Sequence, residues 1–420
     1  MNSHTATVHK PSMKLRAAPR AARRVLALLE KIPHGMLEVQ LPDGHTLRFI
    51  GTHHSDSKPL HARIELNNWM LFERAMQSGD IGMAESYIDG DWQTPDLCAL
   101  LELCIANRTH LERLVYGTWW GSLLHRIKHR KNRNSREGSA KNIHAHYDLG
   151  NDFYKLWLDP TMNYSSAWFE GVSNKNEVPL AQAQTAKVRR ALQQAKVGAG
   201  SRVLEVGCGW GALAEVAAGE FGAHVTGVTL SDEQLNWAQR RLEQAGLGAQ
   251  ADLRFQDYRD LPAQYAQAPF DAVVSIEMFE AVGREYWPAY FDALKRCLKP
   301  GGYACIQTIT IHDDLFERYV RSTDFIQQYI FPGGVLPSPQ QFEAHAHAAG
   351  FEVTDCLAFG ADYAQTLRRW RFDFLARQVQ ARALGFDTRF VRIWEFYLAY
   401  CEAAFEQGNT NVMQYTLRRL

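Results

Sequence analysis

Long hydrophobic runs are missing from this sequence. No stretch of its 420 residues approaches the ~20 consecutive apolar residues that a membrane-spanning helix needs, and its longest apolar runs, such as 271–276, fit a buried strand. The N-terminus is basic but has no long apolar stretch before a small-residue cleavage site, so we expect no secretory signal. The seven cysteines are an odd number without metal-ligand spacing, which predicts reduced thiols in a cytosolic protein and no metal site.

A surplus of charge of one sign is also missing. Lys and Arg total 46 and so do Asp and Glu, so the net charge is zero, which excludes a globally basic nucleic-acid binder. Residues 126–141 are a local exception, with seven cations against the single acid Glu137. This basic stretch is either a solvated linker or a surface for anionic lipid headgroups, where each cation contributes about 1 kcal/mol.

The basic stretch coincides with a change in composition, so we place a domain boundary there. The prediction is an N-terminal domain over 1–125, a basic linker over 126–141 and a larger domain over 142–420. The N-terminal domain has an α+β pattern, although its composition indicates no chemistry.

Two local patterns support the α+β interpretation of the N-terminal domain. Alternating apolar residues on either side of a Pro-Asp-Gly turn predict a hairpin over 36–50. Amphipathic patterns predict helices near 67–77 and 96–106. Residues 79–92 carry turn residues and two aromatic side chains, which we expect to be exposed.

The larger domain alternates strand and helix patterns, which predicts a parallel, doubly wound α/β sheet. The predicted strands are 202–206, 224–230, 253–256, 272–276 and 303–311, with helices over 212–218 and 232–244. Residues 313–337, rich in aromatics and glycine, interrupt this alternation. Residues 363–407 predict long helices whose aromatic side chains form mostly core, while the remainder lines an apolar cavity.

A glycine-rich loop follows the first strand of this sheet. It reads G-x-G-x-G, with Glu205 two residues before its first glycine, Gly207. Such a loop lets the backbone approach a ligand at the carboxyl end of the strand. The third glycine comes one residue earlier than in the dinucleotide fingerprint, so the loop favours a compact ligand with a positive amino-acid end, such as S-adenosylmethionine. The alternative is a tight strand-to-helix turn and nothing more.

The next two strand ends carry polar residues that suit the rest of such a ligand. Thr229 ends the second strand and Gln234 lies one turn into the following helix, where an ordinary helix start capped by Ser231 is the alternative. Asp257 and Tyr258 follow the third strand, where an acid and an aromatic ring would hydrogen-bond and flank an adenine.

Eight stretches of the chain together carry a specific resemblance. They are 146–154, 158–167, 205–211, 225–234, 256–261, 279–283, 329–334 and 359–363. With them, the chain resembles the cyclopropane-fatty-acyl-phospholipid synthase family and the mycolic acid cyclopropane synthases over nearly all of 142–420. The N-terminal domain more loosely resembles the accessory lipid-associating domain of the phospholipid-type enzymes.

The resemblance implies a class I methyltransferase fold. That fold is Rossmann-like, with a mainly parallel seven-stranded sheet and helical insertions around a substrate cavity. It also implies S-adenosylmethionine as the cofactor and an unsaturated phospholipid acyl chain as the substrate. By motif position the cofactor contacts are Tyr164, Ser165, Glu205, Gly207, Cys208, Gly209, Trp210, Gly211, Thr229, Gln234, Asp257, Tyr258 and Ile276.

The family holds a bicarbonate ion as base beside the reacting carbon, and this sequence keeps only part of that site. Glu280 and Tyr363 match, whereas Ser166 stands at a cysteine position and Gln307 at a histidine position; the histidine that follows the glutamate in the family is Ala281 here. Ser and Gln side chains can still hydrogen-bond an anion, but Gln cannot become cationic or shuttle a proton. The predicted catalytic residues are therefore Glu280, Tyr363, Gln307 and Ser166.

Together these features predict transfer of a methyl carbon to the cis double bond of a phospholipid acyl chain, which forms a cyclopropane. Methylene or methyl branching on the same substrate is the alternative, because Ser166 and Gln307 depart from the family pattern. A lipid-binding protein with a decayed site and a methyltransferase for small soluble molecules are alternatives of other classes. We expect peripheral association with the anionic inner face of the membrane and, by resemblance, a homodimer.

Overall fold

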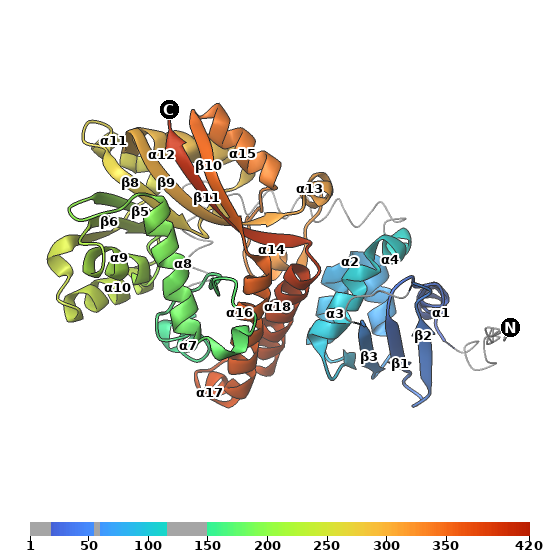
Figure 1. The fold of residues 1–420 in the computed structure, drawn as a ribbon. Helices are drawn as coiled ribbons and strands as arrows, with labels where there is room; N and C mark the ends of the chain where they lie inside the picture. Colours follow the sequence, from blue (N-terminus) through green and yellow to red (C-terminus); the bar gives the residue numbers. More distant parts are fainter. Residues whose placement is uncertain (1–17, 54–58, 116–148) are drawn as a thin grey trace. The chain divides into compact units, whose positions relative to one another are not determined.

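The structure is a computed structural model that describes residues 18–53, 59–115 and 149–420 (Figure 1). The chain divides into two compact units, Met1–Leu123 and Leu124–Leu420. The basic stretch 126–141 and the start of the motif at 146–154 lie outside the described residues. Within the described ranges, no helix combines the length and the apolar character that crossing a membrane requires.

The N-terminal unit is a four-stranded sheet with helices. Its strands, in the order β2-β1-β3-β4, are Thr46–Ile50, Met36–Gln40, His61–Leu66 and Trp92–Gln93. Its helices are α1 (Arg20–Leu29), α2 (Met70–Ile88), α3 (Leu97–Ala106) and α4 (Arg108–Val115). The predicted hairpin is confirmed, because β1 and β2 pair antiparallel with Met36 opposite Ile50.

Residues 79–92 differ from the prediction. Helix α2 continues through Gly79, which has a non-helical φ of 62° and kinks the helix, and it ends only at Ile88. The two aromatics of this segment, Tyr87 and Trp92, are buried with ring centroids 4.9 Å apart. The prediction of exposed aromatics was wrong because these rings pack against each other between α2 and β4.

The larger unit contains a seven-stranded sheet in the order β10-β11-β9-β8-β5-β6-β7. Five strands run parallel: β5 (Arg202–Val206), β6 (His224–Thr229), β7 (Ala251–Phe255), β8 (Phe270–Ile276) and β9 (Leu298–Ile311). This parallel core confirms the predicted α/β sheet. Two further strands, β10 (Phe351–Ala358) and β11 (Thr410–Arg419), pair antiparallel at one edge. They complete the seven strands that the resemblance implied, although their positions were not located from the sequence.

Both faces of the large sheet are buried. Val203 and Leu204 are neighbours on β5 that belong to different apolar clusters, because successive strand residues point to opposite faces. One cluster includes side chains from α8 (Leu180–Gln194), α9 (Ala212–Gly219) and α10 (Asp232–Gln244). The other includes α11 (Leu261–Tyr265), α12 (Trp287–Cys297) and α15 (Pro339–Ala348) (Figure 1). The sheet is therefore a rigid, doubly covered platform.

The remaining helices lie beyond this platform. They are α7 (Asn151–Tyr154), α13 (Asp313–Tyr319), α14 (Phe325–Tyr329), α16 (Gly360–Ala376), α17 (Gln378–Ala383) and α18 (Thr388–Glu406). The buried carboxylate of Glu402 on α18 accepts hydrogen bonds from Arg368 and Arg371 of α16, at 2.9 and 2.8 Å. The 313–337 insertion packs against α18, since the ring centroids of Phe325 on α14 and Phe396 on α18 lie 4.9 Å apart.

We expect Phe342→Ala to lower the free energy of unfolding by about 3–5 kcal/mol, the usual cost of emptying a buried aromatic site. The Phe342 ring is fully buried and stacks on Tyr415 of β11, with centroids 4.2 Å apart. Chemical denaturation of the full chain measures the change. Phe342→Leu should cost less than about 1.5 kcal/mol.

The matched control is Phe372→Ala, which removes the same ring from an exposed site and should change the free energy of unfolding by about 0.5 kcal/mol or less. Equal losses for the two alanine variants would contradict the packing described for β11 and α15.

Candidate active site

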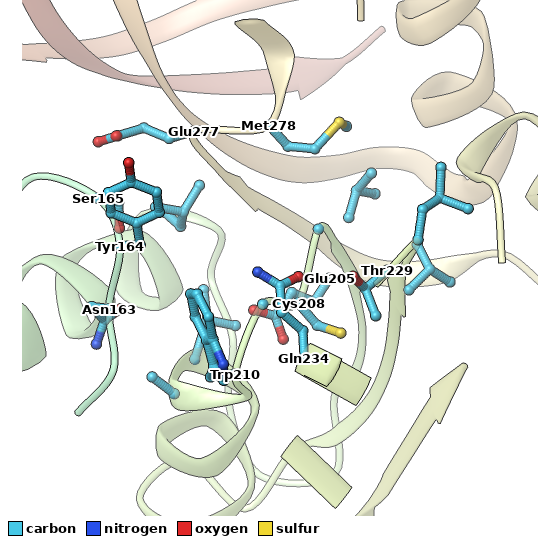
Figure 2. Close-up of a pocket in the computed structure, with 18 of the residues that line it drawn as sticks. Asn163, Tyr164, Ser165, Glu205, Cys208, Trp210, Thr229, Gln234, Glu277 and Met278 are labelled. Carbon is cyan, nitrogen blue, oxygen red and sulfur yellow. Dashed lines mark hydrogen bonds between the residues drawn. The ribbon is translucent and has the colours of Figure 1, made fainter. Parts of the chain in front are cut away.

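A cavity lies at the carboxyl ends of β5, β6 and β8. Its wall combines the loop after β5, the ends of β6 and β8, and the segment around residues 162–165. Figure 2 shows Tyr164, Glu205, Thr229 and Glu277 arranged around it. Ligands of open α/β sheets bind at this edge, so the topology alone makes it the first place to look for a site.

The glycine loop turns tightly at the bottom of this cavity. Gly207, Gly209 and Gly211 all have left-handed backbone, with φ of 89°, 50° and 82°. A Cβ on Gly207 would lie 2.9 Å from Met278, and one on Gly211 would lie 2.8 Å from Ala238. A Cβ on Gly209 would meet no atom within 4 Å. The first and third glycines are therefore needed for packing, and the second leaves open space for a ligand.

Two buried polar atoms on the cavity wall have no hydrogen-bond partner among the described residues. They are Oε2 of Glu205 and Nε2 of Gln256. Glu205 is only 3% exposed, and this burial raises the pKa of its carboxyl group. Because a buried polar group is costly without a partner, both atoms are suited to bind a ligand. An acceptor in this position fits the α-ammonium group of S-adenosylmethionine.

Residues at and just after the ends of β6 and β7 also line the cavity. The Thr229 hydroxyl donates a 3.0 Å hydrogen bond to Oε1 of Gln234, so these two polar side chains lie side by side on the cavity wall. Tyr258 lines the cavity as predicted from its position after β7. The Cys208 thiol has a pKa well above its usual value because it is buried, which fits its interpretation as a small packing residue.

The segment before α8 supplies the wall facing the glycine loop. The hydroxyls of Tyr164 and Tyr397 lie 2.7 Å apart, which joins this segment to α18. The Ser165 hydroxyl accepts a hydrogen bond from Lys187, a fully buried residue of α8. Burial lowers the pKa of Lys187 to about 8. Sequence reasoning missed this lysine, although its place on the buried, Ala- and Val-rich face of α8 was a signal.

Glu277, which directly follows β8, gathers three of the four predicted catalytic residues. Its Oε1 accepts from the Ser166 amide at 2.8 Å and from Gln307 Nε2 at 2.7 Å. Its Oε2 accepts from the Tyr363 hydroxyl at 2.8 Å. Sequence reasoning missed Glu277 as well. The available signal was its position at the carboxyl end of a central strand.

The fourth predicted catalytic residue, Glu280, lies apart from this group and does not line the cavity. Its Oε1 accepts from the Thr308 hydroxyl at 3.0 Å and from the Ile309 amide. Burial, together with the neighbouring Glu277 carboxylate, raises the pKa of Glu280 to about 8. Both effects favour the neutral form of this carboxyl group.

Most of the predicted cofactor contacts line the cavity. They are Tyr164, Ser165, Glu205, Gly207, Cys208, Gly209, Trp210, Thr229, Gln234, Tyr258 and Ile276. Gly211 and Asp257 do not. Gly211 packs against α10, and the Asp257 carboxylate is paired with Arg259 at 2.6 Å. Gln256, one residue earlier, lines the wall in place of Asp257.

The residues implied as bicarbonate ligands do not fit that ion here. The Gln307 amide and the Tyr363 hydroxyl both donate to the Glu277 carboxylate. The Ser166 hydroxyl donates to the Ala167 carbonyl at 2.9 Å, and its amide donates to Glu277. The donors that would hold a small anion are thus bound to a carboxylate of the protein itself.

Comparisons with known proteins agree with this geometry. The family described as mycolic acid cyclopropane synthetase matches residues 134–415. Tuberculostearic acid methyltransferase UfaA1 of Mycobacterium tuberculosis is 40% identical over 357 residues, which cover 83% of this chain and 81% of that protein. Cyclopropane-fatty-acyl-phospholipid synthase of Escherichia coli is 35% identical over 392 residues, covering 91% of this chain and 96% of that protein.

A solved structure is also similar. Mycolic acid cyclopropane synthase CmaA1, complexed with SAH and CTAB, has a TM-score of 0.60 and 34% identity, covering 67% of this chain and 98% of that one. These findings confirm both the resemblance seen in the motifs and the class I methyltransferase fold, here with a mixed seven-stranded sheet. The chain therefore belongs to the mycolic acid cyclopropane synthetase family and is an S-adenosylmethionine-dependent methyltransferase of the cyclopropane synthase type.

Proposed function

We propose that this protein transfers the methyl carbon of S-adenosylmethionine to the cis double bond of an unsaturated phospholipid acyl chain, forming a cyclopropane. The observation that carries the proposal is the cavity at the glycine loop. It is lined by Glu205, whose Oε2 has no hydrogen-bond partner among the described residues, and by the Glu277 carboxylate with its three donors. The residues that would bind the cofactor and a carboxylate that could accept a proton therefore line the same cavity.

The cofactor side of the proposal assigns a partner to each polar group of the wall. Glu205 would accept from the α-ammonium group, while Thr229 and Gln234 would hold the ribose hydroxyls. Gln256 and Tyr258 would contact the adenine, and the open space at Gly209 would admit the ligand close to the backbone. When bound, S-adenosylmethionine supplies an electrophilic methyl group.

The residues beside the cavity must position a poor nucleophile and exclude water. The Tyr164 ring lies 5.6 Å from the Trp370 ring and 6.5 Å from the Phe331 ring. These rings would orient the acyl chain and stabilise a secondary carbocation through their π faces. The aromatic character of this side favours a lipid over a small polar substrate.

Methylene or methyl branching is the second candidate. The relatives' names point to both outcomes, since one is a tuberculostearic acid methyltransferase and another a cyclopropane synthase. After the methyl group has been added, the product depends on which proton is removed. Removal from the new methyl group closes a ring, whereas a hydride shift followed by removal from the chain gives a methylene group.

Peripheral association with an anionic membrane is part of the proposal. The end of α16 and the following α17 expose Phe372 and Val379, at 74% and 73%, together with Leu384. The exposed Arg382 lies in the same stretch, as does Arg377, which also pairs with Asp373 at 3.2 Å. Apolar side chains among cations match an anionic lipid surface, where the apolar groups enter the acyl region and the cations bind headgroups. Lipid association and dimerisation through residues 1–125 also remain proposals.

We expect the purified protein to add one carbon to the acyl chains of mono-unsaturated phosphatidylglycerol vesicles when S-adenosylmethionine is present. Mass spectrometry detects the added mass, and proton NMR distinguishes the products. Upfield ring protons identify a cyclopropane, and vinylidene protons identify a methylene branch. Methylation of soluble metabolites without any change in the vesicles would contradict the lipid assignment.

Glu205→Gln should weaken binding of S-adenosylmethionine roughly 10- to 100-fold, because it removes a carboxyl oxygen that would accept from the α-ammonium group in a buried site. Isothermal titration calorimetry of the full chain measures the affinity. Glu220→Gln is the matched control, since Glu220 lies just after α9, is solvent-exposed and pairs with Arg189 outside the cavity. Unchanged affinity in Glu205→Gln would remove Glu205 from the proposed site.

The double variant Phe372→Ser/Val379→Ser should bind anionic vesicles at least about tenfold more weakly, because it removes apolar area that would be buried in the membrane. Co-sedimentation with phosphatidylglycerol vesicles measures the partition coefficient. Phe255→Ser is the control, because Phe255 is 50% exposed on β7 and lies outside the α16–α17 stretch. Equal effects of both changes would contradict a specific membrane contact at α16 and α17.

A further inference from the structure

The conformation of Glu277 shows that its carboxylate is held in place by its surroundings. Its backbone has a φ of 50°, a left-handed value that a residue with a long side chain rarely adopts. Its amide donates a 2.8 Å hydrogen bond to the Gln307 carbonyl, so both its backbone and its side chain are tied to β9. Such strain persists where the surrounding structure fixes it, and it is concentrated at functional sites.

The orientation of the Gln307 amide is also set by the protein. Its Oε1 accepts from Gln414 Nε2 at 2.9 Å, and Gln414 in turn accepts from Arg190 at 2.7 Å. Arginine can only donate, so the Gln414 oxygen must face Arg190 and the Gln414 amide nitrogen must face Gln307. This series of hydrogen bonds fixes both amides in one orientation and directs Gln307 Nε2 toward the Glu277 carboxylate. The residue that replaces the family histidine is therefore arranged to bind an anion, and that anion is Glu277.

The groups around Glu277 include one cation, Lys187, and three hydrogen-bond donors that stabilise its ionised form. Burial raises the pKa of Glu277, while the positive charge of the buried Lys187 and the three hydrogen-bond donors act in the opposite direction. For Glu280, burial and the neighbouring Glu277 carboxylate both raise the pKa.

Glu277 also has room to accept a proton. A carboxylate offers about four acceptor sites, and the described residues donate to three of them, two at Oε1 and one at Oε2. The remaining site is on Oε2. The residue lines the cavity together with Tyr164 and Met278, and Figure 2 shows its side chain directed toward the side where Tyr164 and Ser165 lie.

We propose that the Glu277 carboxylate is the base that completes the reaction, in the place where the family uses a bicarbonate ion. This inference rests on the proposed function and names the group that removes the proton. Ser166, Gln307 and Tyr363 are then positioning residues, because they hold the carboxylate and act through it.

In the proposed reaction, methyl transfer precedes removal of the proton by Glu277. The alkene π electrons form a bond to the cofactor methyl carbon while its C–S bond breaks and leaves an electron pair on sulfur. The neighbouring chain carbon becomes cationic. Glu277 then takes a proton from the added methyl group, and the C–H electrons close the ring. The chain gains CH₂ overall, and Glu277 releases the proton to solvent after the products leave.

The first test compares Glu277→Gln and Glu280→Gln in the full-length protein, with S-adenosylmethionine and mono-unsaturated phosphatidylglycerol vesicles. We expect kcat to fall 10²- to 10⁴-fold in Glu277→Gln, the usual contribution of a general base, and less than about tenfold in Glu280→Gln. Calorimetry with S-adenosylhomocysteine should give Glu277→Gln an affinity within about threefold of wild type, which shows that the cofactor site is folded.

The second test does not depend on that variant folding. Wild-type activity should persist in buffer stripped of carbon dioxide and should not rise when bicarbonate is added. Glu277→Ala removes the side chain but leaves the donors of Ser166, Gln307 and Tyr363. Added formate, acetate or bicarbonate should therefore restore part of its activity, and chloride at the same ionic strength should not.

Three outcomes would overturn the assignment of Glu277. They are a wild-type enzyme that needs bicarbonate, a Glu277→Gln enzyme that keeps more than a third of its kcat, or a loss that is larger in Glu280→Gln. A wild-type protein that binds S-adenosylhomocysteine but leaves the vesicle lipids unchanged would instead overturn the proposed function, and the base assignment with it. Persistence without carbon dioxide, together with rescue by formate, would support both.

Discussion

The Glu277 carboxylate and its three donors are the interaction on which the rest of this site depends. The donors come from the segment before α8, from β9 and from α16, so one charged group ties the sheet to the helices that cover it. A buried carboxylate is costly without such partners, and this cost fixes the conformation of every element that supplies one. The same charge supports the buried Lys187 cation and raises the pKa of Glu280.

The sheet supplies rigidity, and the loops at its carboxyl edge supply chemistry. Both faces of the parallel strands are covered by helices, which leaves the loop ends as the accessible part of the platform. The glycine loop, the ends of β6 and β8, and the segment around Tyr164 all meet there. Sites built on loops that a rigid scaffold positions are a common solution, because side chains can vary without loss of the fold.

Several departures from the pattern that the motifs resemble meet at Glu277. Ser166 and Gln307 replace a cysteine and a histidine, and both now donate to a carboxylate of the same chain. Gln414 and Arg190 fix the orientation of the new amide, which a histidine would not require. Read together, these residues describe one rearranged site, whereas each substitution read alone suggests a weakened one.

The sequence alone determined what local patterns encode. The hairpin over 36–50, the alternation from β5 to β9 and the glycine loop depend on residues close together in the chain, so their spacing predicted them. The local patterns could not locate β10 and β11 at the sheet edge, although the resemblance implied seven strands, and they could not give the burial of Tyr87 and Trp92. They also missed Glu277, because its donors Ser166 and Tyr363 lie 111 and 86 positions away in the chain. Only the tertiary structure decides which distant donors meet one carboxylate, because hydrogen bonding and desolvation act over a few ångströms of space, whatever the separation in sequence.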